Sequence, residues 1–136
     1  MGLGVNAEPI LQSLELVVER IGDPTPQVYA RLFAAQPEME ALFVMDKNYA
    51  ARGHMLSESL TAIIDFVGER QYADNLMRSE IMNHEGMGVP PAVFATFFTV
   101  IRDTFRETLG DDWSDEMENA WSVLLNEISD TIPVHA

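Results

Sequence analysis

The chain has 136 residues, 47% of them hydrophobic and 22% charged, which predicts one globular domain over residues 1–136 with a core of its own. Its formal net charge of −14 argues against nucleic acid and membrane surfaces as partners, and no apolar run approaches the roughly 20 residues that cross a bilayer. The lack of cysteine excludes disulfides and thiolate metal sites, and the N-terminus has no secretory pattern, so we expect a cytoplasmic protein.

Apolar residues recur with a helical period in the first half of the chain, where no segment alternates as a strand would. The first helix is predicted to end at Gly22. Its predicted buried face consists of Leu11, Leu14, Val17, Val18 and Ile21. Thr25 is predicted to cap a second helix with Pro26 at its first position, where the missing N–H costs nothing. A short turn over 37–43 then leads to a longer helix over about 52–67.

The second half of the chain predicts three more helices. The first covers 73–85 and ends at Gly86. The next is opened by Pro90 and Pro91 and closed by Gly110, and its buried face is unusually aromatic. That face consists of Phe94, Phe97, Phe98, Ile101 and Phe105. Ser114 is predicted to cap the last helix. The last helix has a buried face of Met117, Trp121, Leu124 and Ile128. The sequence therefore predicts an all-α fold.

One histidine, His84, shares a helical face with Met77 and Ile81 just before a glycine-rich stop. A neutral imidazole that points into an apolar space is suited to bind iron or zinc, whereas a buried histidine that is bonded to a carbonyl is the structural alternative. No second histidine or carboxylate stands beside it at metal-ligand spacing. This argues against zinc and leaves haem, for which one protein ligand suffices.

Three runs stand in a particular order along the chain: VYARLFAAQPEMEALF (28–43), NHEGMGVPPAVF (83–94) and LGDDWSDEMENAW (109–121). Their joint order and spacing resemble the globin family, in particular the bacterial single-domain globins and the haem domain of flavohaemoglobins. The resemblance spans nearly the whole chain. It implies a globin-like fold of six to eight helices and haem b as the cofactor.

The resemblance also implies the roles of individual residues. His84 would be the axial ligand of the iron, and Phe43 would pack on the porphyrin. Val89 and Phe94 would line the same side as His84. On the opposite side, the resemblance places Tyr29 as a hydrogen-bond donor to a bound ligand.

Bacterial relatives commonly pair this tyrosine with a glutamine on the following long helix, where this chain offers His54 and Met55 instead. Met55 repeats through Ser59 beside the core face, whereas His54 repeats through Glu58 into a polar stripe. Met55 is therefore the better candidate to face the iron. His54 remains the alternative, and bis-histidine iron would follow from it.

These residues predict a protein that binds O₂, NO or CO at an iron held by His84, for oxygen binding and storage or for gas sensing, rather than an enzyme. One alternative is a haem-free globin-fold module for regulation or interaction, suggested by Met55 and Ser59. Another is a nitric-oxide dioxygenase or peroxidase that needs an external reductase. Phe94 counts against this last alternative, because flavohaemoglobins carry a tyrosine there.

Overall fold

The computed structural model describes residues 6–43, 45–46, 50–71, 73–86 and 91–131. Within these ranges the chain forms six α-helices and two short 3₁₀-helices, with no strand. In chain order they are α1 (Ala7–Ile21), α2 (Thr25–Ala35), η1 (Pro37–Phe43), α3 (Ala50–Val67), α4 (Ala73–Gly86), α5 (Pro91–Leu109), η2 (Gly110–Asp112) and α6 (Asp115–Thr131). The predicted all-α fold is confirmed. No described helix has both the length and the apolar run that crossing a membrane requires.

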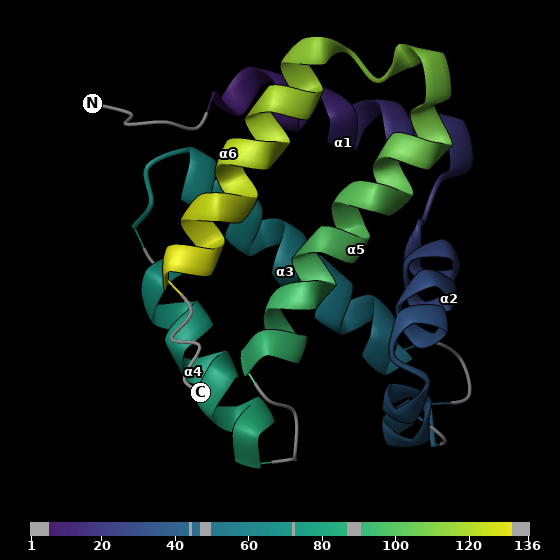
Figure 1. Cartoon of the computed structure of the whole chain (residues 1–136), viewed down its shortest axis with the longest axis vertical. Helices are drawn as coiled ribbons and strands as arrows, with labels where there is room; N and C mark the ends of the chain where they lie inside the picture. The colour runs from purple at the N-terminus through teal and green to yellow at the C-terminus, as the bar shows by residue number, and fades with distance from the viewer. Residues whose placement is uncertain (1–5, 44, 47–49, 72, 87–90, 132–136) are drawn as a thin grey trace.

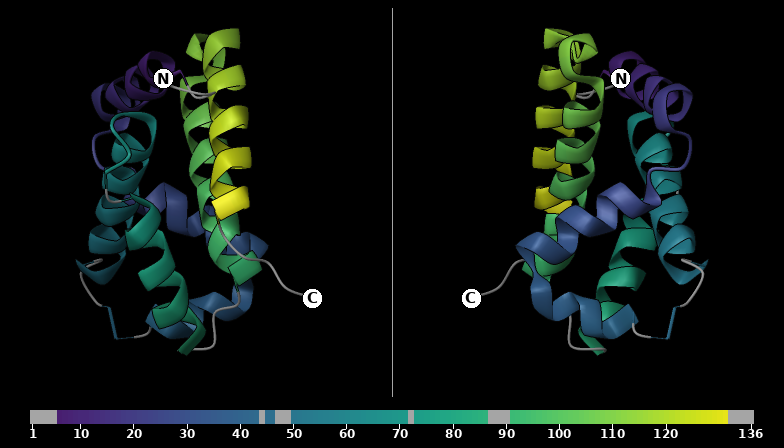
Figure 2. Two further views of the ribbon diagram at one scale, coloured as in Figure 1. Left: turned by 90° about the vertical axis from the view of Figure 1, so that its left-hand side faces the viewer. Right: turned by 90° about the vertical axis from the view of Figure 1, so that its right-hand side faces the viewer.

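The helices surround a core in two crossing layers. Helices α5 and α6 lie side by side and antiparallel, and α1 contacts both of them near one end (Figure 1). Helix α3 passes on the far side of the core and contacts α1, α2 and α4 (Figure 2). Helix α2 also contacts α5 and η1, and α4 contacts α5. The space between α2, α3, α4 and α5 is where the candidate site lies.

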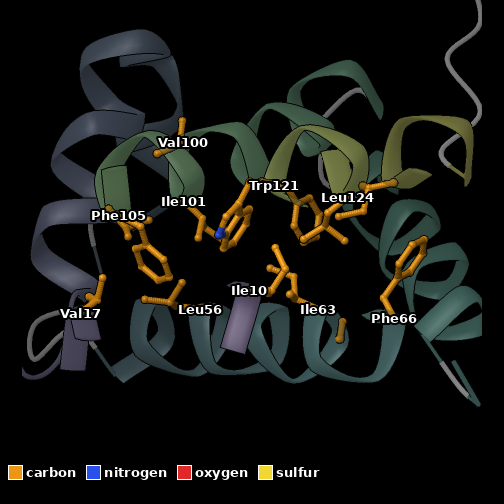
Figure 3. Close-up of a cluster of buried hydrophobic side chains, with 14 of the residues drawn as sticks. Ile10, Val17, Leu56, Ile63, Phe66, Val100, Ile101, Phe105, Trp121 and Leu124 are labelled. Carbon is orange, nitrogen blue, oxygen red and sulfur yellow. The ribbon is translucent and has the colours of Figure 1, made fainter. Parts of the chain in front are cut away.

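The core is built on a buried tryptophan. Trp121 of α6 packs edge-on against Phe105 of α5, with ring centroids 5.8 Å apart. Its indole Nε1–H donates to the Ser13 hydroxyl at 3.0 Å, and that hydroxyl donates to the Ile10 carbonyl at 2.6 Å. Figure 3 shows side chains of α3, including Ile63, reaching towards Trp121 from the opposite layer. The buried Ser13 hydroxyl therefore both accepts and donates a hydrogen bond within the core.

Most predicted core residues are buried, but the predicted face of α1 is rotated by about one residue. Leu11 and Val18, which were expected inside, are 40% and 59% exposed. The buried residues of α1 are Pro9, Ile10, Ser13 and Val17. The prediction was wrong because it followed hydrophobicity alone, whereas Ser13 is buried through its hydrogen bonds to Ile10 and Trp121.

Helix ends follow local chemistry. The last turn of α1 stops at Gly22, whose φ of +71° is open to glycine at little cost. Ser114 caps α6 as predicted, because its Oγ accepts the Met117 N–H at 3.1 Å. The predicted cap at Thr25 was wrong. The carboxylate of Asp23 accepts both the N–H and the hydroxyl of Thr25, at 2.9 and 2.6 Å, so Thr25 is already the first residue of α2.

Candidate functional site

A cavity of about 190 Å³ lies between α2, η1, α3, α4 and α5. Its lining is largely apolar. The apolar lining residues are Leu32, Met39, Leu42, Phe43, Met55, Ala62, Leu76, Met77, Phe97 and Phe98. The other lining residues are Tyr29, His54, Glu58, Ser59 and Glu80. A cavity with apolar walls and a few polar groups is the usual form of a small-molecule or cofactor site.

The structure brings five of the predicted site residues to this one cavity. They are Tyr29 of α2, Phe43 of η1, and His54, Met55 and Ser59 of α3. They come from three separate elements, so only the folded chain places them together.

The remaining predicted residues, His84, Val89 and Phe94, are not among the described lining residues of the cavity. The backbone of His84 lies in α4, one turn after Glu80 and two turns after Met77, both of which line the cavity. The backbone of Phe94 lies in the first turns of α5. The side chains of His84 and Phe94, and the whole of Val89, lie outside the described residues.

Tyr29 contributes a buried polar group to the lining of the cavity. Its side chain is buried among Phe43, Phe33 and Phe97, with ring centroids 5.3, 5.8 and 5.5 Å away. Among the described residues, no donor or acceptor lies within hydrogen-bonding distance of its hydroxyl. An unsatisfied buried hydroxyl is uncommon in folded proteins, which makes this group a candidate partner for a ligand.

The protonation state of Tyr29 follows from its surroundings. Burial raises the pKa of the phenol far above its ordinary value, while nearby Arg52 lowers that pKa and Asp46 raises it. The net effect is upward, so the phenol keeps its proton at all physiological pH values. Tyr29 can therefore act as a hydrogen-bond donor to whatever enters the cavity.

Helix α3 presents two different stripes to the cavity. Met55, Ser59 and Ala62 are half-buried or buried, whereas His54 and Glu58 are exposed and lie at the mouth. The Ser59 hydroxyl donates to the Met55 carbonyl at 2.9 Å, so its proton is already used within the helix. The inner part of this wall therefore offers a thioether and small groups rather than a free donor.

Sequence reasoning missed several lining residues. Phe97 and Phe98 were assigned to the core, because a cavity wall and a core face have the same helical pattern. Glu58 and Glu80, whose carboxylates border the cavity, were not proposed as lining residues. Glu80 stands one turn before His84, so the expectation that no carboxylate is suitably spaced from this histidine was wrong, and that spacing is the signal that could have identified Glu80.

Comparisons with known proteins agree with this geometry. The family model described as Globin matches residues 26–132. A leghemoglobin from Psophocarpus tetragonolobus is 39% identical over 46 residues, which cover 34% of this chain and 32% of that relative. The match thus spans about a third of the length of that curated relative. The search of solved structures found no match.

Proposed function

The chain belongs to the globin family, whose members bind haem, and from this membership we propose that the cavity beside Tyr29 holds haem b and a diatomic gas ligand. The observation that carries the proposal is the Tyr29 hydroxyl, which is buried in an apolar cavity without a partner among the described residues. A hydroxyl that is desolvated in the folded chain gains most from a ligand that accepts a hydrogen bond from it. The gas would be O₂ or NO, with CO as a third ligand.

The described residues fit a flat apolar cofactor. Phe43, Met77, Phe97 and Phe98 supply aromatic and thioether surface on several sides of the cavity. In this proposal His84 holds the iron from α4, and Val89 and Phe94 pack on the same side. When bound, haem iron supplies a coordination position for a diatomic molecule, and the polarity around that position decides what binds.

The residues on the Tyr29 side then have distinct tasks. Tyr29 donates a hydrogen bond into the cavity, and its raised pKa keeps that proton in place. Met55 and Ser59 wall the cavity without adding a free donor. His54 is the alternative neighbour of the iron, and in that case it would turn inward from the mouth.

The proposed role is oxygen binding and storage or gas sensing in the cytoplasm, without an enzymatic reaction. The quoted runs around His84 and Trp113 support the bacterial single-domain type within the family. Turnover of NO would require an external reductase as a partner. A phenylalanine at position 94 has no hydroxyl with which to strengthen an axial histidine through a hydrogen bond.

The test is an absorption spectrum of the purified protein in its ferric, ferrous and ferrous-CO forms, with and without added haemin. We expect a Soret band that His84→Ala abolishes or shifts and that the control His135→Ala leaves unchanged. An unchanged spectrum in His84→Ala would refute the ligand assignment. A six-coordinate ferrous spectrum without CO that becomes five-coordinate in His54→Ala would establish the histidine alternative. A chain that takes up no haemin would favour the haem-free module.

A further inference from the structure

A buried ion pair stands just outside the cavity, where α3 begins. Arg52 Nε lies 3.7 Å from Asp46 Oδ2, and the two side chains are only 12% and 7% exposed. The Asp46 carboxylate also accepts the backbone N–H groups of Ala51 and Arg52, at 2.9 and 3.0 Å. Asp46 therefore anchors both the first turn of α3 and the guanidinium of Arg52.

The guanidinium leads directly to the aromatic wall that carries Tyr29. Arg52 Nη2 donates to the Phe43 carbonyl at 3.4 Å. Its Cζ lies 5.4 Å from the ring centroid of Phe43 and 5.6 Å from that of Phe33, within the range of a cation–π contact. The Tyr29 ring packs against these same two rings, with centroids 5.8 Å from Phe33 and 5.3 Å from Phe43. Arg52 is not among the residues that line the cavity, so it acts on the site through the rings that it contacts and through its charge.

Stability alone is a poor explanation for this pair. Removing two charges from water costs about as much as their attraction returns, and apolar residues of similar volume often stabilise a fold equally well. A guanidinium does two things that an apolar side chain cannot do. It fixes the Phe43 backbone through a directed hydrogen bond, and it places a positive charge near the Phe43 ring, which the Tyr29 ring contacts. That charge acts on Tyr29, because it is the main influence that opposes the effect of burial on the phenol pKa.

We propose that Arg52, held by Asp46, is a positioning residue that fixes the Phe33 and Phe43 rings under Tyr29 and strengthens the Tyr29 hydroxyl as a hydrogen-bond donor into the cavity. This inference rests on the proposed function, because the donor matters only if a ligand binds there. It adds a residue outside the cavity to the set that controls ligand binding.

The test uses the C–O stretching frequency of carbon monoxide added to the reduced, haem-loaded protein, which falls when a positive group or a donor lies near the ligand. The double variant Asp46→Asn with Arg52→Met removes both charges, so no buried charge is left unpaired, and asparagine keeps an acceptor for the α3 cap. We expect the frequency to rise towards that of Tyr29→Phe. The single variant Arg52→Lys should raise the frequency by less than the double variant does, since lysine keeps the positive charge without the guanidinium.

A double-mutant cycle separates an effect through Tyr29 from a direct effect. In a Tyr29→Phe background the same double variant should cause no further rise, and an equal rise in both backgrounds would overturn the inference. An unchanged frequency in the wild-type background would also overturn it. The matched control is Arg31→Met, because Arg31 lies on the same helix as Tyr29 but pairs with Glu107. Its frequency should stay at the wild-type value.

A second measurement covers a chain that takes up no haem, in which no carbonyl band would exist in any variant. Tyrosine labelled with ¹³C at Cζ reports the surroundings of the phenol by NMR, and Tyr29→Phe identifies the resonance of Tyr29. We expect this resonance to move in the Asp46→Asn and Arg52→Met double variant and to stay in place in Arg31→Met. A Tyr29 resonance that does not move in the double variant would overturn the positioning role. This result is independent of haem uptake, which tests the proposed function.

Discussion

Tyr29→Phe should make the haem-free chain more stable. The substitution removes only the hydroxyl, and the ring keeps its contacts with Phe43 and Phe97. The residue is 1% exposed and its hydroxyl has no partner among the described residues, so folding strips water from a group that gains nothing in return. Such an uncompensated burial costs about 1–3 kcal/mol.

The expected gain in the free energy of unfolding is therefore about 1–2 kcal/mol, which corresponds to a rise in Tm of about 4 °C per kcal/mol for a chain of this size. Urea unfolding followed by circular dichroism measures the first quantity, and thermal unfolding measures the second. Once haem and O₂ are bound, Tyr29→Phe should instead be unfavourable, because the hydroxyl then has a partner. Loss of one hydrogen bond to O₂, about 1.4 kcal/mol, should speed O₂ release about tenfold.

The control is a buried hydroxyl that has partners. Ser13 Oγ accepts from Trp121 and donates to Ile10, so Ser13→Ala leaves a buried indole N–H unpaired and should lower stability by about 1–3 kcal/mol. The two hydroxyl deletions should thus change stability in opposite directions. If Tyr29→Phe were destabilising in the haem-free chain, the phenol would have a stabilising partner in the folded protein, and the argument for an unsatisfied donor would fail.

Three smaller predictions test local features by equilibrium unfolding. Ser114→Ala removes the α6 cap and should lower stability by about 1 kcal/mol; an unchanged midpoint would show that the cap adds nothing. Gly22→Ala should lower stability by roughly 1–3 kcal/mol, because alanine is strained at a φ of +71°; the added methyl group meets nothing within 4 Å, so no clash contributes. A neutral result would mean that the turn relaxes. Burial alone would raise the pKa of Asp46, but the N–H groups of Ala51 and Arg52 and the guanidinium hold that pKa below its ordinary value. Its stabilising effect should therefore be fully present above about pH 4 and be lost as pH falls through the folded-state value, so Asp46→Asn should flatten the acid limb of stability against pH and an equally steep limb would count against the pair.

The helices were predictable because most of the information that defines them is local. Gly22, Gly110 and Ser114 mark helix ends through φ or a side-chain cap, and each acts within a few residues. The error in the buried face of α1 arose because a distant partner determines which residue is buried. Ser13 is buried because Trp121, 108 residues away in sequence, needs an acceptor, and no pattern within α1 contains that fact.

The candidate site was predictable to a different extent. Resemblance to a family identified Tyr29 and Phe43, and helical phase identified Met55; the structure places all three around one cavity. The contacts of Arg52 with Phe33 and Phe43 could not be found in this way, because they depend on how η1 meets the first turn of α3.

The choice between Met55 and His54 shows how the fold limits the chemistry of the site. The two residues are adjacent, so a helix separates their directions by about 100° and only one can face the inner cavity. Met55 continues through Ser59, whose hydroxyl is bonded to the helix, while His54 continues through the exposed Glu58. Turning α3 to bring His54 inward would also move Glu58 towards the apolar interior, where an unpaired carboxylate is costly. In the proposed function, this orientation would leave Tyr29 as the donor to a bound ligand. Discrimination between polar and apolar gases should then depend on a single hydrogen bond, and Tyr29→Phe should remove most of it.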